Sequence, residues 1–223
     1  MPRALLPPPR LRRFAVAAVL AAGCGAAWGG AQQYEPLAAS VRAALHAAVS
    51  DARAPELPIA DAGERAQWLA EMSRRLQKRI PDADYRTELL TSIHYEATRA
   101  GLDPQLVLGL VQVESNFRKY AISTAGARGF MQVMPFWIQV IGRPDDNLFH
   151  LRTNLRYGCT ILRHYLDIER GDLYRALGRY NGSLGKPEYP NLVRTAWERD
   201  WSWKPARLTT AAAEPGPLPS LSR

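Results

Sequence analysis

Residues 101–135 read GLDPQLVLGLVQVESNFRKYAISTAGARGFMQVMP, and this stretch decides the fold of the 223-residue chain. Asp103 is placed to cap a helix, and Pro104 occupies the first helical position, where proline is best tolerated. The positions that follow, 106–113, are apolar on nearly every side of the helix. Such a pattern predicts a helix that lies inside a core and not along a surface.

One acidic residue, Glu114, lies at the C-terminal end of the predicted buried helix. Ser115 follows, and then a loop rich in Gly and Ala, which closes on the Met- and Phe-containing turn of residues 129–135. Burial disfavours the carboxylate anion, and the negative end of the helix dipole acts in the same direction, so this position favours a raised carboxyl pKa. A carboxyl group of this kind can serve as a general acid near neutral pH.

The first thirty-one residues are typical of a secretory signal peptide. They hold four arginines and no acid, then a short apolar run at 14–22 that is too short for a membrane span, and then small residues. Cleavage just before Gln32 fits this pattern. The preceding segment Ala21-Ala22-Gly23-Cys24 is similar to a bacterial lipoprotein box, with Ala21 where leucine is usual. The sequence therefore predicts a periplasmic or exported protein and leaves membrane anchoring through a lipidated Cys24 open.

Charge and cysteine usage exclude several classes of protein. The net charge is +8, but without residues 1–31 the chain has 25 basic and 21 acidic residues. This mild excess predicts no nucleic-acid partner, and it suits an anionic polymer outside the cytoplasm. After cleavage Cys159 is the single cysteine, so no internal disulfide or thiolate metal cluster can form, and an apolar helical face predicts that it is buried. His94 and Glu96 lack a second histidine at metal-binding spacing, which indicates a structural histidine. We expect no metal and no organic cofactor.

The periodicity of the chain predicts an all-α protein with several segments. Residues 32–60 are a linker with a weak helical pattern near 40–50, and residues 61–81 are a helical extension that begins with a capping box at Asp61. The main domain covers 82–203, and 204–223 form a disordered tail rich in Pro, Ala and Thr. Within the main domain, helices are expected from Asp82 or Asp84 to Gly101, over 136–141, through Leu151 to Leu166, from the cap Asp172 to Asn181, and over 191–201.

Three motifs in order resemble the catalytic domain of soluble lytic transglycosylases, bacterial enzymes with a goose-type-lysozyme-like helical fold. They are Glu114-Ser115, residues 129–135 (GFMQVMP) and Tyr180-Asn181, and the resemblance runs from about Asp84 to Trp201. It implies a single lysozyme-like helical domain in which Glu114 is the only catalytic acid/base. The residues that it implies for the sugar cleft are Ser115, Met131, Gln132, Tyr180 and Asn181.

The chain departs from the family pattern at two places. Phe130 replaces the usual leucine after the motif glycine, which is an apolar exchange. Arg179 and Gly182 flank the Tyr-Asn pair where the family commonly has alanine, and Ser183 stands where it has glycine.

The resemblance also implies a reaction. Most glycosidases use two carboxylates, but here only Glu114 is well placed, while Asp145 and Asp146 lie in a polar turn. The family reaction cuts the β-1,4 bond between N-acetylmuramic acid and N-acetylglucosamine without water and leaves a 1,6-anhydro-muramic acid end. The partner is then a peptidoglycan glycan strand, bound by a monomer.

Two alternatives remain open at this stage. A lysozyme-type hydrolase would need Asp145 or Asp146 as a second carboxylate, and a non-catalytic wall-binding or assembly protein would keep the cleft without the chemistry. The sequence also leaves open whether the protein acts on chain ends or interiors, whether it needs stem peptides, its biological role, and the role of residues 32–80.

Overall fold

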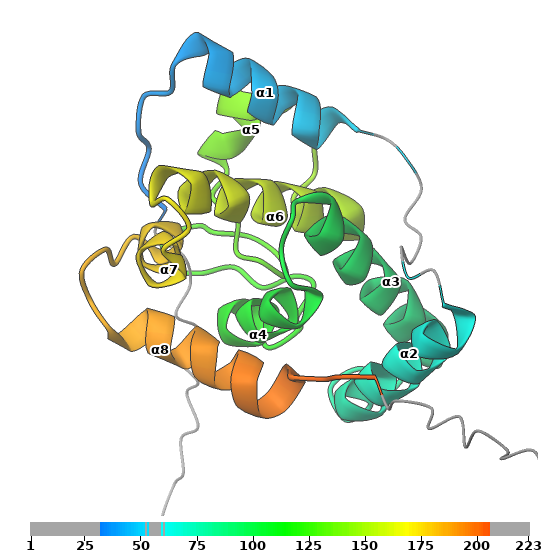
Figure 1. Cartoon of the computed structure of the whole chain (residues 1–223). Coiled ribbons are helices and arrows are strands. Elements are labelled where there is room, and N and C mark those ends of the chain that lie inside the picture. Colours follow the sequence, from blue (N-terminus) through cyan, green and yellow to red (C-terminus); the bar gives the residue numbers. More distant parts are fainter. Residues whose placement is uncertain (1–31, 52, 54–58, 60, 206–223) are drawn as a thin grey trace, which may run out of the picture.

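The computed structural model describes residues 32–51, 53, 59 and 61–205, and within these ranges the chain is all α-helical (Figure 1). The elements are α1 (Ala39–Ser50), α2 (Ala62–Leu76), α3 (Ala83–Arg99), α4 (Pro104–Ser115), α5 (Phe136–Ile141), α6 (Leu151–Ile168), α7 (Leu173–Asn181), α8 (Glu188–Thr195) and the π-helical turn η1 (Ala196–Trp201). The described part contains no strand, only two isolated antiparallel bridges, Ile122 to Arg128 and Arg128 to Val133. The predicted all-α class is confirmed. The predicted signal peptide with Cys24, and the tail from 206 onward, lie outside the described residues.

Aspartate side chains fix where four of the helices begin. The carboxylate of each accepts a hydrogen bond from a backbone N–H two or three residues ahead, which satisfies a donor that the helix itself leaves unpaired. The pairs are Asp61 with Glu64 at 2.6 Å, Asp82 with Tyr85 at 2.9 Å, Asp103 with Gln105 at 2.7 Å and Asp172 with Arg175 at 3.0 Å. These caps confirm the helix starts predicted from the sequence. The last predicted helix differs, since it begins at Glu188 and ends as η1.

Helix α4 lies in the middle of the molecule, with α3, α6, α7 and α8 around it (Figure 1). Its apolar residues from Leu106 to Val111 are buried, as predicted, with Leu108 and Leu110 fully so, whereas Val113 is only partly buried. Gly109 lets η1 approach closely: a Cβ there would come within 2.8 Å of the Trp197 backbone nitrogen. The central helix is therefore closely covered by its neighbours, and Glu114 and Ser115 at its C-terminal end are buried as well.

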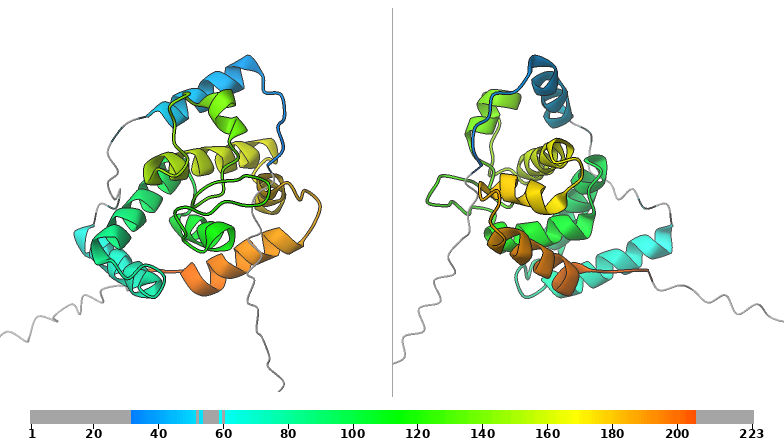
Figure 2. Two further views of the ribbon diagram at one scale, coloured as in Figure 1. Left: turned by 180° about the vertical axis from the view of Figure 1, so that it is seen from behind. Right: turned by 60° about the vertical axis from the view of Figure 1, so that its left-hand side comes forward.

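The two N-terminal helices cover other parts of this core. Helix α2 packs against α3 and buries Trp68 and Met72, while α1 packs on α5 and α6 and buries Val49 (Figures 1 and 2). No helix among the described residues has the length and apolar character needed to cross a membrane.

The pH dependence of the protein's stability can test this packing, through His94 on α3. The side chain is 8% exposed and meets the Trp68 ring edge-on, with 4.7 Å between ring centroids. Burial lowers the pKa of His94 from 6.5 to about 4. Between these pH values His94 is protonated in the unfolded chain but not in the folded chain. The free energy of unfolding therefore keeps its full value above about pH 6.5 and falls by up to about 3 kcal/mol towards pH 4.

We therefore expect His94→Gln to reduce the loss of melting temperature between pH 7 and pH 4.5. The measurement is thermal unfolding of the wild type and the variant across this range, with the exposed His150→Gln as the matched control. Parallel curves for the wild type and His94→Gln would contradict the expectation.

Candidate active site

Glu114 lies in the last turn of α4 with its side chain fully buried. The Tyr189 hydroxyl, on the first turn of α8, donates a hydrogen bond to Glu114 Oε1. Burial, together with the adjacent Glu114 carboxylate, raises the pKa of Tyr189 well above 10. Tyr189 therefore remains a protonated donor at any ordinary pH and holds one oxygen of the acid in a fixed position.

Gln132 stands at the centre of the motif loop, in a left-handed conformation with φ 48° and with no exposed surface. Its Nε2 donates to the carbonyls of Ala121 at 3.1 Å and Gly129 at 2.9 Å. Within the described residues its Oε1 is buried without a hydrogen-bond partner. Because buried polar atoms are normally paired, this oxygen is a candidate acceptor for a ligand hydroxyl or amide.

Tyr180 connects the C-terminal half of the domain to the same loop. Its hydroxyl donates to the Met131 carbonyl at 2.7 Å, and the residue is fully buried. Burial and then the charge of Glu114 raise the pKa of Tyr180 well above 10, while the Gln32 side chain lowers it slightly. The Met131 side chain lies against Gly158 of α6, where an added Cβ would come within 2.3 Å of its sulfur. Met131 is thus fixed from two sides.

Asn154 on α6 clamps the motif loop. Its Oδ1 accepts from the Met131 backbone N–H at 2.8 Å, and its Nδ2 donates to the carbonyls of Arg128 and Leu148, each also at 2.8 Å. There is no room for a side chain at Gly129, because an added Cβ would come within 2.6 Å of the Leu148 carbonyl oxygen. The backbone there also has φ 76°, which favours glycine. The sequence analysis did not single out Asn154.

Ser115 and Asn181 occupy different surroundings. The Ser115 hydroxyl is buried and donates to the Phe130 carbonyl at 2.8 Å, so it ties the end of α4 to the motif loop. Asn181 is half-buried at the end of α7, and its amide donates to Ser183 Oγ at 3.1 Å. Gly182 there adopts φ 73° and ends the helix. The structure therefore brings five of the six predicted site residues together at the motif loop. The sixth, Asn181, follows Tyr180 at the half-buried end of α7.

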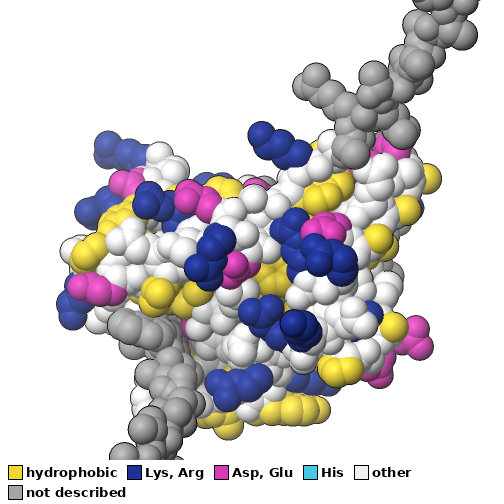
Figure 3. Space-filling model, turned by 90° about the horizontal axis from the view of Figure 1, so that it is seen from below, with side chains coloured by type: hydrophobic (Ala, Val, Ile, Leu, Met, Phe, Trp, Pro, Cys, Tyr) yellow, Lys and Arg dark blue, Asp and Glu magenta, His cyan; other side chains and the backbone are white. Residues whose placement is uncertain are grey.

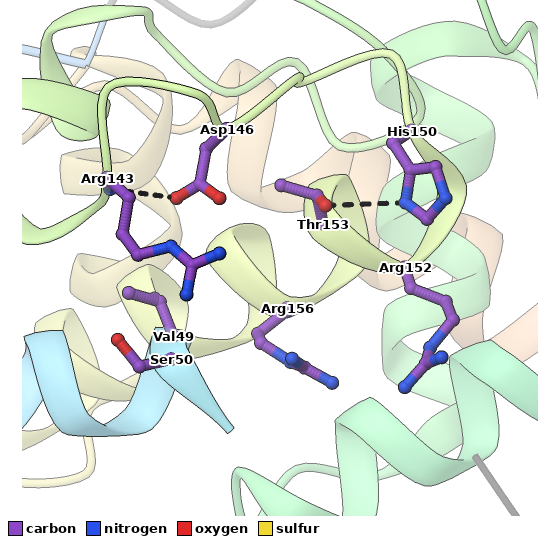
Figure 4. Close-up of a pocket in the computed structure, with 8 residues that line it drawn as sticks. All are labelled: Val49, Ser50, Arg143, Asp146, His150, Arg152, Thr153 and Arg156. Carbon is purple, nitrogen blue, oxygen red and sulfur yellow. Dashed lines mark hydrogen bonds between the residues drawn. The ribbon is translucent and has the colours of Figure 1, made fainter. Parts of the chain in front are cut away.

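The two other carboxylates considered from the sequence belong to a different place. Asp146 accepts from the Tyr157 hydroxyl and from the Arg143 backbone N–H at 3.0 Å. It lines a pocket at the start of α6, which Figure 4 shows with the side chains of Arg143, Arg152 and Arg156. The Asp145 side chain is 77% exposed and lies beside Arg143. Both aspartates are thus bound into the loop that precedes α6.

The remaining reactive groups are enclosed. Cys159 on α6 is buried, as predicted, with its sulfur 3.9 Å from that of Met131, and burial raises the pKa of the thiol. Glu96 is fully buried between Arg99 at 2.9 Å and Arg156 at 2.8 Å. The described residues contain no group of three or more His, Cys, Asp or Glu placed to hold a metal ion.

Basic side chains gather on one face of the molecule (Figure 3). The face seen from below carries many Lys and Arg side chains, with acidic ones among them (Figure 3). On α2 and around η1, an open pocket is lined by Arg74, Arg75, Arg79 and Arg199, with Asp200 among them. Arg79 donates to Asn116 Oδ1 at 2.9 Å, two residues beyond Glu114.

Comparison with known proteins finds the same family that the sequence motifs resemble. Residues 91–191 match the model of the family described as Transglycosylase SLT domain. A transglycosylase of Enterobacteria phage PRD1 is 36% identical over 88 residues, which are 40% of this chain and 32% of that protein. Membrane-bound lytic murein transglycosylase C is 48% identical over 46 residues in Mannheimia succiniciproducens and 52% over 46 residues in Haemophilus influenzae, in each case 21% of this chain and 13% of the relative. The chain spans a third or less of the length of these relatives.

Proposed function

We infer that this chain, which carries a transglycosylase SLT domain at residues 91–191, is a lytic transglycosylase that acts on peptidoglycan. One observation carries the inference. Glu114, the acid at the end of the central helix, is fully buried beside the motif loop and accepts a hydrogen bond from a tyrosine that stays protonated. A single enclosed carboxyl held in this way is suited to a reaction in which one residue acts first as acid and then as base.

In the proposed reaction, protonated Glu114 donates to the glycosidic oxygen between N-acetylmuramic acid and N-acetylglucosamine. The N-acetyl group of the muramic acid assists departure at the anomeric carbon. The Glu114 carboxylate then takes the proton from the C6 hydroxyl of the same sugar, and the C6 oxygen closes a 1,6-anhydro ring. Each proton that leaves Glu114 is returned to it, and no water is consumed.

The surroundings of Glu114 support roles for the other site residues. Gln132 Oε1, to which none of the described residues hydrogen-bonds, is the proposed acceptor for a sugar group, with Met131 and Tyr180 as the wall beside it. For Ser115 we propose an indirect role, because its hydroxyl is already donated to the Phe130 carbonyl. Asn181 is proposed as a rim contact.

The organisation of the whole chain remains part of the proposal. We propose a signal peptide at 1–31, a linker at 32–60, a helical extension at 61–81, a catalytic domain at 82–203 and a tail at 204–223. The protein would be exported and monomeric, without a nucleic-acid partner and without a resident cofactor. Two relatives are named membrane-bound, which supports a location at the cell envelope and keeps lipid anchoring through Cys24 within the proposal.

The test is mass spectrometry of the muropeptides that the purified protein releases from sacculi. We expect products that are one water lighter than hydrolysis products and end in 1,6-anhydro-muramic acid. Ordinary reducing ends would instead identify a lysozyme-type hydrolase. No release by folded protein would favour a wall-binding or assembly role.

A further inference from the structure

The segment ahead of α1 reaches into the candidate active site. Residues 33–36 are exposed, whereas Gln32 next to them is only 3% exposed. In Figures 1 and 2 this segment descends from α1 along the side of the molecule that carries α7. One polar side chain is thus buried at the end of an otherwise exposed segment, which lies outside the family match at 91–191.

The Gln32 carboxamide meets the backbone of the motif loop with both of its groups. Its Oε1 accepts from the Met134 N–H at 3.1 Å, and its Nε2 donates to the Gln132 carbonyl at 3.4 Å. Gln132, whose carbonyl is one of these partners, also carries the Oε1 atom for which the described residues offer no hydrogen-bond partner. The loop itself is tied to the end of α4 by the hydroxyl of Ser115, the residue next to Glu114.

We propose that the Gln32 carboxamide is a built-in ligand, which occupies the place of a substrate acetamido group until substrate displaces it. The inference rests on the proposed function for the identity of that substrate. An acetamido group has one carbonyl acceptor and one N–H donor, and the carboxamide of glutamine presents the same pair. The Met134 N–H and the Gln132 carbonyl provide the complementary donor and acceptor, so the two groups compete for one site.

The anchoring of the segment is weak enough for displacement. The two hydrogen bonds of Gln32 are long, with the one from Nε2, at 3.4 Å, beyond the usual range, and a neutral hydrogen bond contributes little net free energy. The segment also makes an ion pair between Glu35 and Arg179 at 2.9 Å and an edge contact of Tyr34 with Phe136, and Leu37 packs against the core. Glu35 and Tyr34 are more than half exposed, and exposed ion pairs stabilise only slightly.

The test compares the affinity of the protein and its variants for tetra-N-acetylchitotetraose by isothermal titration calorimetry, with the bond between residues 31 and 32 kept intact, because an N-terminal glutamine cyclises and loses its carboxamide. Gln32→Ala removes the competing carboxamide and should bind the tetrasaccharide about fivefold more tightly, as expected from the loss of one neutral hydrogen-bonding competitor. Gln32→Glu keeps the size of the side chain but places an acceptor against the Gln132 carbonyl, and it should also bind more tightly. Gln33→Ala, at the exposed neighbour, is the matched control and should bind like the wild type.

Equal affinity of Gln32→Ala and Gln33→Ala would overturn the inference. Weaker binding by Gln32→Ala would overturn it too, since Gln32 would then support the motif loop. Absence of binding by every variant would show that the site takes no acetamido group, with the same consequence. The proposed reaction is judged separately: tighter binding by Gln32→Ala without cleavage of sacculi would refute the reaction alone, whereas cleavage with unchanged affinities would refute the inference alone.

Discussion

Replacing Glu114 with Gln is expected to lower the rate of muropeptide release by about a thousandfold or more, because one residue provides both proton transfers. Glutamine has nearly the same shape, and its Oε1 can still accept the hydrogen bond of the Tyr189 hydroxyl, so the fold should be unaffected. The amide neither donates a proton to the glycosidic oxygen nor takes one from a C6 hydroxyl. The measurement is the initial rate of release of anhydro-muropeptides, with the melting temperature recorded on the same preparations.

Glu188→Gln is the matched control for this variant. It makes the same chemical change at an exposed position next to Tyr189 and should keep wild-type activity. Activity retained by Glu114→Gln, at an unchanged melting temperature, would remove Glu114 from the chemistry. A large loss in both variants would indicate that α8, and not the acid, had been disturbed.

Replacing Asn154 with Ala is expected to destabilise the protein by about 3–5 kcal/mol and to abolish most of the activity. The variant leaves the Met131 N–H and the carbonyls of Arg128 and Leu148 without their partner, and each buried unpaired group costs about 1–3 kcal/mol. For a domain of this size the melting temperature should fall by about 10 °C. Activity should fall as well, because the same bonds fix Met131 and Gln132 next to the acid.

Asn147→Ala is the control for the Asn154 variant. Asn147 is exposed and makes one local bond, to the Phe149 N–H at 2.8 Å, which water can replace. We expect its melting temperature to change by less than about 2 °C. Hydrogen exchange at the Met131 amide should become much faster in Asn154→Ala only. A melting temperature and an exchange rate close to the wild type would mean that the loop keeps its shape without the clamp.

The parts of the fold that the sequence predicted correctly depend on neighbours along the chain. A capping aspartate such as Asp103 acts on an N–H two residues away, and the apolar run of α4 lies within a dozen positions. The start of the last helix was missed because Pro190 suggests a break, although proline is accepted in a first turn. The three sequence motifs led to the prediction that Glu114, Gln132 and Tyr180 belong to one site. Each motif could be read from the sequence because its residues are neighbours along the chain.

The residues that the sequence did not reveal act over long distances. Gln32 lies 100 positions from Gln132, Tyr189 lies 75 from Glu114, and Asn154 lies 23 from Met131. Residue type alone does not say which distant backbone group such a side chain will meet. Asn154 did carry a signal, since it is a polar residue on the buried side of α6 and a buried amide requires partners. Tyr189 carried none beyond its type.

The bond between Tyr189 and Glu114 has a consequence for when the site comes into existence. A ribosome makes the acid on α4 long before the tyrosine on α8, so a chain interrupted before position 189 contains Glu114 without its donor. Such a fragment also lacks the α8 and η1 contacts that enclose α4. We therefore expect a chain that ends before Tyr189 to lack the proposed activity, even though it contains Glu114.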